Sequence, residues 1–123
     1  MRLLLIDSAT SENDSLCAAL EPHGFTVSGC GELERAKELH LDRPFDAVLI
    51  DATRQGIDGI DFCNWVRALP DGDRVAIVVS LAALDQKIVT EYLSGGSGDV
   101  LCCPLDPRTI RFDIEAALHH RTM

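Results

Sequence analysis

The sequence predicts an α/β protein in which a strand and a helix alternate five times, a (βα)5 pattern. Short apolar runs rich in Val, Ile and Leu recur along the chain, as in strands buried on both faces of a parallel sheet. Segments with apolar residues at helical spacing separate these runs. Parallel strands joined by right-handed crossovers receive helices on both faces, so we expect a doubly wound sandwich.

The first half of the chain contains two strand and helix units. In order, they are a strand at 3–6, a helix at about 12–21, a weaker edge strand at 25–30 and a helix at 32–41. Ser11 and Asp14 have the spacing of a capping box, which starts the first helix, and Pro22 and Gly24 end it. The inner side of the second helix is expected to carry Leu33, Ala36 and either His40 or Leu39.

The second half contains three more units. They are a strand at 47–50, a helix carrying Phe62, Val66 and Leu69 that ends near Pro70, a strand at 75–79, a helix at 83–93, a strand at 100–102 and a last helix opened by Pro107. The last helix should face inward with Ile110, Ile114, Ala117 and Leu118. The glycine-rich residues 94–98 indicate a helix stop, because they lack the Lys and Ser/Thr of a phosphate-binding loop and precede a strand.

Size and charge limit the function classes. The 123 residues predict one domain, 1–123, with a core large enough to need no disulfide or metal. The net charge of -9 argues against direct nucleic-acid binding and favours a cationic partner. No run is long enough to span a membrane and no signal-peptide pattern is present, so we expect a cytoplasmic protein.

The five cysteines show no metal-binding spacing. They form no Cys-x-x-Cys pair, and adjacent Cys102 and Cys103 would point to opposite faces of a strand. We therefore expect small buried hydrophobic residues in a reducing compartment.

Polar side chains follow three of the predicted strands. Asp7 comes after the first, Asp51 after the third and Ser80 after the fourth. The carboxyl edge of an open α/β sheet is where ligands bind. If the strand order is the flavodoxin-like 2-1-3-4-5, Asp7 and Asp51 lie on neighbouring strands, with Ser80 next along this edge and Cys103 beside it.

With these residues the chain resembles the receiver domain of bacterial two-component response regulators over nearly its whole length. The segment from Asp51 to Gly59 matches the family pattern Asp-x-x-x-Pro-Gly-x-Asp-Gly except that Gln55 replaces the Pro. The resemblance implies that Asp51 accepts a phosphoryl group from a sensor histidine kinase in the presence of Mg²⁺. It also implies that the Thr53 carbonyl binds the metal and that the Ser80 hydroxyl contacts the phosphoryl group.

Three positions depart from the family pattern. Ser8 replaces the second acid after the first strand, Cys103 replaces the Lys before the proline of the fifth, and Val100 replaces the switch aromatic. A hydroxyl is a poor Mg²⁺ ligand, so a site made of Asp7, Asp51 and Thr53 should bind the ion weakly or not at all. The loss of one acid and one Lys nevertheless leaves the charge balance of the site with Mg²⁺ unchanged.

Two functional hypotheses follow. The first is a working phosphorelay receiver, served by a sensor kinase or a phosphotransfer protein. The second is a pseudo-receiver that binds partners without phosphorylation. A redox role for Cys103 is disfavoured, because nearby carboxylates disfavour a thiolate. A flavin site at the hydroxyls after the first strand is disfavoured, because helix capping explains these hydroxyls. An independent enzyme is disfavoured, because no His accompanies a nucleophile.

A homodimer is expected from the resemblance alone. The face formed by the fourth helix, fifth strand and fifth helix is where the family dimerises. Arg108 and Arg111, near Asp99 and Asp113 in the sequence, could pair across such an interface, although exposed pairs of this kind contribute little.

Overall fold

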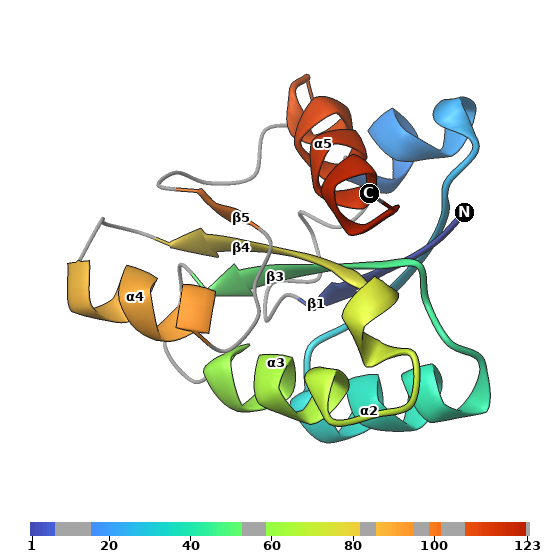
Figure 1. Ribbon diagram of the computed structural model, residues 1–123. Helices are drawn as coiled ribbons and strands as arrows, with labels where there is room; N and C mark the ends of the chain where they lie inside the picture. The colour runs from blue at the N-terminus through green and yellow to red at the C-terminus, as the bar shows by residue number, and fades with distance from the viewer. Residues whose placement is uncertain (7–15, 53–58, 82–85, 95–98, 102–107, 123) are drawn as a thin grey trace.

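A five-stranded parallel sheet forms the centre of the protein, as the computed structural model shows for residues 1–6, 16–52, 59–81, 86–94, 99–101 and 108–122 (Figure 1). The strand order is β2-β1-β3-β4-β5, and every neighbouring pair is parallel. The strands are β1 (Arg2–Ile6), β2 (Thr26–Cys30), β3 (Ala47–Ala52), β4 (Ala76–Leu81) and β5 (Asp99–Leu101). The predicted fold class and strand order are confirmed.

Helices cover both faces of the sheet (Figure 1). The helical elements are residues 16–20, η1 (Glu21–His23), α2 (Leu33–Asp42), α3 (Gly59–Arg67), η2 (Gly72–Arg74), α4 (Gln86–Ser94) and α5 (Ile110–Thr122). Residues 16–20 and α5 lie on one face, and α2 and α3 lie on the other. Among the helices that the structure describes, none is long and apolar enough to cross a membrane.

The core is divided by the sheet into two clusters, because successive residues of a strand point to opposite faces. One cluster joins alternate strand residues such as Val48 and Ile50 to α2, α3 and α4. The other joins residues such as Leu49 and Val78 to residues 16–20 and α5. The last helix contributes all four residues that its spacing predicted, Ile110, Ile114, Ala117 and Leu118, and each is buried.

Several element ends differ from the sequence predictions. The strand β3 continues through Asp51 and Ala52, and β4 continues through Ser80 and Leu81, because these residues pair with one another across the two strands. The helix α3 ends at Arg67, so the half-buried Leu69 belongs to the following turn rather than to the helical stripe. The predicted starts of the first, fourth and fifth helices lie outside the described residues.

The structure identifies the buried side chains on the inner faces of α2 and α4, and those of α4 were not singled out by the spacing. In α2 the choice between two inward residues is settled by the ring of His40, which is buried, while Leu39 is partly buried against the same core. In α4 the packed side chains are Val89 and Tyr92, whereas Ile88 is 39% exposed.

Candidate functional site

Asp51 and Ser80 lie side by side near the carboxyl edge of the sheet. They are register partners on the parallel strands β3 and β4, whose spacing is about 4.8 Å. Asp51 is 3% exposed and Ser80 is fully buried. The strand order therefore brings together a carboxylate and a hydroxyl that are 29 residues apart in the numbering.

Strand alternation decides which face these two side chains share. Asp51 has the same parity as Leu49, and Ser80 has the same parity as Val78. Leu49 and Val78 both belong to the core cluster under α5. Asp51 and Ser80 therefore continue the rows of side chains on the α5 face, at the point where the apolar core gives way to polar groups.

The other predicted site residues, Asp7, Ser8, Thr53 and Cys103, lie outside the described residues. The described strands nevertheless end beside the site. Ile6, the last residue of β1, pairs with Ile50, and Leu101, the last residue of β5, pairs with Ser80.

The donor chemistry of the described part of the site is compatible with a hard cation but incomplete. The Asp51 carboxylate supplies oxygen ligands of the kind that Mg²⁺ prefers. Within the described residues, no group of three or more His, Cys, Asp or Glu side chains is arranged to hold a metal ion. A magnesium site would therefore need ligands from the segments that follow β1 and β3.

Two of the described cysteines, Cys30 and Cys63, do not resemble reactive thiols. Burial raises the pKa of Cys63 to about 11, although the nearby Arg67 guanidinium opposes this shift. Burial also raises the pKa of the half-buried Cys30. Because the thiolate is the reactive form, both are poor nucleophiles at neutral pH.

Tyr92 in α4 is a buried aromatic residue that the sequence reasoning missed. Its ring is 3% exposed and lies against Gly59, the first residue of α3, where an added Cβ would be 2.7 Å from the Tyr92 hydroxyl oxygen and 3.2 Å from Ile50. Tyr92 thus packs α4 against the first residue of α3. Tyr92 follows Val89 by three residues, and side chains at this spacing lie on the same face of a helix, so the spacing could have indicated that Tyr92 faces inward.

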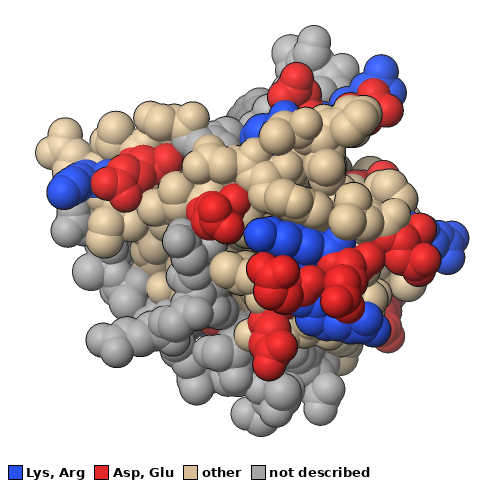
Figure 2. Space-filling view, turned by 90° about the horizontal axis from the view of Figure 1, so that it is seen from below, with Lys and Arg blue, Asp and Glu red and all other residues tan. Residues whose placement is uncertain are grey.

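The face formed by α2 and α3 mixes charges of both signs (Figure 2). Lys37 in α2 lies 3.5 Å from the carboxylate of Asp61 in α3 and 3.6 Å from that of Glu34. Arg35 pairs with Glu38 at 3.1 Å. These neighbouring opposite charges do not form the single-sign basic surface that binds a phosphate backbone.

Curated proteins similar in sequence are response regulators. The chain is 30% identical over 118 residues to the transcriptional regulatory protein QseB of Escherichia coli O157:H7, covering 96% of the chain and 53% of that protein. It is 26% identical over 117 residues to the probable chemotaxis protein CheY of Rhizobium etli, covering 94% of the chain and 91% of that protein. The chain thus spans about half the length of QseB and most of that CheY. No family model matches the chain.

Solved structures show the same fold. A two-component response regulator from Clostridium difficile superposes with a TM-score of 0.85 at 20% identity, over 100% of this chain and 99% of that one. A CheY-like receiver domain protein from Methanospirillum hungatei superposes with a TM-score of 0.85 at 19% identity, over 98% and 95% of the two chains. The chain is therefore similar in sequence to response regulators and has the fold of solved receiver domains, with the same kind of parallel sheet and with Asp51 and Ser80 as register partners.

Proposed function

We propose that residues 1–123 form one receiver domain in which Asp51 accepts a phosphoryl group from the phosphohistidine of a sensor histidine kinase or a phosphotransfer protein. The observation that carries this proposal is the register pairing of Asp51 with Ser80 near the carboxyl edge of the sheet. In this role the domain is modified and then bound by a partner, and it is not an independent enzyme.

The transfer requires one bond to form and one to break. A carboxylate oxygen of Asp51 attacks phosphorus, and the bond between phosphorus and the imidazole nitrogen of the donor breaks, which leaves an acyl phosphate. In this proposal the Ser80 hydroxyl donates a hydrogen bond to a phosphoryl oxygen on Asp51, which the register pairing of the two residues supports.

A magnesium site made of Asp7, Asp51 and the Thr53 carbonyl belongs to the same proposal, with low affinity because Ser8 supplies no charge. When bound, Mg²⁺ offsets the negative charge of the phosphoryl oxygens. Cys103 supplies no cation in place of the family Lys. The domain therefore lacks the ion pair between this Lys and the phosphoryl group. An ion pair at about 4 Å contributes on the order of 4 kcal/mol at a surface-like effective dielectric, before desolvation is subtracted.

The test is phosphorylation of the whole chain with acetyl phosphate and Mg²⁺. Intact mass should show one added phosphoryl group that hydroxylamine removes. Asp51→Asn should abolish the label, and Ser80→Ala should reduce the labelled fraction. Asp71→Asn is the matched control, because Asn tolerates the left-handed backbone of this distant residue. Absence of a hydroxylamine-sensitive label at any donor concentration would contradict the proposal.

A pseudo-receiver is the second candidate. Ser8, Cys103 and Val100 favour it, since each lacks a group that the family uses for metal binding, charge neutralisation or switching. In this case partners bind the unmodified domain, and Asp51→Asn leaves their response unchanged. Loss of the response in a folded Asp51→Asn protein would exclude this function.

We further propose that the domain forms a homodimer through α4, β5 and α5. Exposed apolar side chains on the two helices support this proposal, namely Leu93 in α4, which is 51% exposed, and Phe112 in α5, which is 59% exposed. Arg111 is a weaker contributor than its sequence position suggested. Its guanidinium lies 3.6 Å from Glu115 of the same helix and 2.7 Å from the ring of His23.

A further inference from the structure

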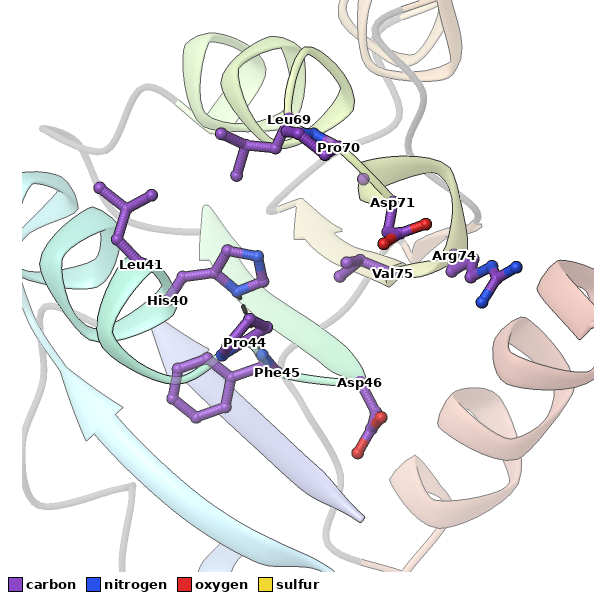
Figure 3. Close-up of a pocket in the computed structure, with 11 residues that line it drawn as sticks. His40, Leu41, Pro44, Phe45, Asp46, Leu69, Pro70, Asp71, Arg74 and Val75 are labelled. Atoms are coloured by element: carbon purple, nitrogen blue, oxygen red, sulfur yellow. Dashed lines mark hydrogen bonds between the residues drawn. The ribbon is translucent and has the colours of Figure 1, made fainter.

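A cavity of about 330 Å³ lies at the amino edge of the sheet, opposite the end that carries Asp51 (Figure 3). The end of α2, the connection from α2 to β3 and the connection from α3 to β4 line it. Asp46 at its rim precedes Asp51 by five residues, or roughly 16 Å along a strand. The cavity is therefore separate from the proposed phosphorylation site, and its volume is within the range of small-molecule sites.

His40 points a hydrogen-bond donor into this cavity. Its side chain is 4% exposed, and its Nδ1 accepts a hydrogen bond of 3.2 Å from the backbone N–H of Phe45. Because Nδ1 accepts, the proton of the neutral ring is on Nε2. Nε2 faces the cavity (Figure 3), and among the described residues the hydrogen bond of His40 is the one through Nδ1. Burial lowers the pKa of His40, which keeps the ring neutral at physiological pH.

One wall of the cavity is held by stacking around Phe45. The ring of Phe45 has the guanidinium of Arg2 4.6 Å from its centroid, and it stacks with the ring of His40 at a centroid distance of 6.0 Å and an interplanar angle of 20°. The Arg2 guanidinium also donates to the carbonyls of Arg43 and Pro44. These contacts fix the orientation of both aromatic rings before any ligand arrives.

The opposite wall is the connection from α3 to β4, which is closed by Arg67. Its Nη1 donates to the carbonyl oxygens of Gly72 at 2.5 Å and Val75 at 2.7 Å. Gly72 allows this closure, since a Cβ there would be 1.9 Å from the Val66 carbonyl oxygen. Asp71 adopts a left-handed backbone with φ of 61°. The cavity is thus largely preformed, which reduces the ordering cost of binding.

The chemistry of the lining selects the ligand class. The inner lining is apolar, with Phe45 and Val75 buried and Leu69 half-buried. The charged side chains of Asp46, Asp71 and Arg74 are exposed at the rim, and Asp46 already accepts a 2.8 Å hydrogen bond from the backbone N–H of Arg2. We propose that this cavity binds a small neutral molecule that combines an apolar ring with a carbonyl oxygen, which accepts a hydrogen bond from His40 Nε2.

The probes are acetophenone and ethylbenzene, which share a phenyl ring and a two-carbon substituent but differ in the carbonyl oxygen. Each is titrated into the ¹⁵N-labelled whole chain while the backbone amide signals are followed. Acetophenone should shift the Phe45 and Val75 signals saturably and leave Ser80 unaffected. Ethylbenzene should bind roughly three- to tenfold more weakly, the effect of one net hydrogen bond.

Two matched substitutions isolate the donor. His40→Asn retains an acceptor near the Nδ1 position for the Phe45 N–H but lacks the Nε2 proton, so it should bind the two probes equally. His40→Gln retains an N–H near the Nε2 position, so it should keep the preference for the ketone. A ketone preference that survives in His40→Asn would overturn the proposal.

A third variant covers the case in which a His40 variant does not fold. Leu69→Trp, at a half-buried position in the lining, should fill the cavity and abolish the shifts from both probes. Saturable, oxygen-dependent shifts confined to the cavity residues support the proposal. Equal binding of the two probes to the unsubstituted protein, shifts centred elsewhere, or no shift up to the solubility limit of acetophenone contradicts it.

Discussion

His40 combines a buried ring with a tautomer that one hydrogen bond fixes. The accepted hydrogen bond from Phe45 and the low exposure favour the neutral ring in the folded protein. In the unfolded chain the same ring titrates with a pKa of about 6.5. Burial lowers the folded-state pKa below this value, so protonation couples to unfolding.

The sign of this coupling gives a stability prediction. Below pH 6.5 the unfolded chain binds a proton that the folded ring resists, so the free energy of unfolding should fall as the pH falls from 6.5 toward the folded-state pKa. Above pH 6.5 this contribution is fully present. The loss is at most about 1.4 kcal/mol per pH unit from one group.

The contribution of His40 to the pH dependence of the unfolding free energy is measured by urea unfolding of the unsubstituted protein and of His40→Asn between pH 5 and pH 8. The difference in unfolding free energy between the two proteins should be constant above pH 6.5 and should shrink below it, since Asn does not titrate. A difference that is independent of pH would refute the assignment of this slope to His40. Carboxylates titrate in both proteins, and the comparison removes their contribution.

The connection between α3 and β4 shows how an element boundary depends on a single small residue. After α3 ends at Arg67, the chain turns through Pro70 and enters the 3-10 turn η2. The guanidinium of Arg67 bonds to two carbonyl oxygens of this connection. The polypeptide therefore passes so close to Val66 that no Cβ fits at Gly72.

Gly72→Ala should destabilise the protein by at least about 2 kcal/mol, because the backbone must move away from Val66 and break the Arg67 contacts. Gly24→Ala is the control. Gly24 has a φ of 90° but nothing within 4 Å of the added Cβ, so its cost is only the backbone strain of about 1 kcal/mol. Urea unfolding compares the two variants. Equal losses of unfolding free energy in the two variants would show that the backbone at Gly72 moves away from Val66 at little cost.

At the scale of the whole molecule, the sheet separates the two edges for which we propose functions. The carboxyl edge carries Asp51 and Ser80, and the amino edge carries the His40 cavity. The strands β3 and β4 run between both edges and pair along six residues. The proposed binding in the cavity and the proposed modification of Asp51 therefore concern the two ends of the same pair of strands.

The proposed dimer is also a property of the whole molecule. Solution mass at rising protein concentration should show a monomer and dimer equilibrium, which Phe112→Ser weakens because it removes an exposed apolar contact from α5. Leu41→Ser is the control, since Leu41 is 63% exposed on α2. Added salt should change the equilibrium little if apolar contacts dominate. A monomer at high concentration at both low and high salt would contradict the dimer.

Part of this architecture could be predicted residue by residue. Apolar runs such as Ala47 to Ile50 indicated buried parallel strands, and the spacing of Ile110 and Ile114 indicated the inner face of the last helix. These predictions succeeded because burial on both faces of a sheet leaves a local apolar signal. The ends of β3 and β4 were predicted too short, since Asp51 and Ser80 are polar and their strand pairing depends on each other.

The sequence by itself determined that the protein is a five-unit α/β domain with candidate polar residues after the strands, because periodicity and strand-end chemistry are local properties of the chain. Only the tertiary structure decided that Asp51 and Ser80 are register partners, that Tyr92 packs against Gly59, and that His40 directs an N–H into a cavity. Each of these depends on contacts between segments distant in the sequence, which strand order and packing establish.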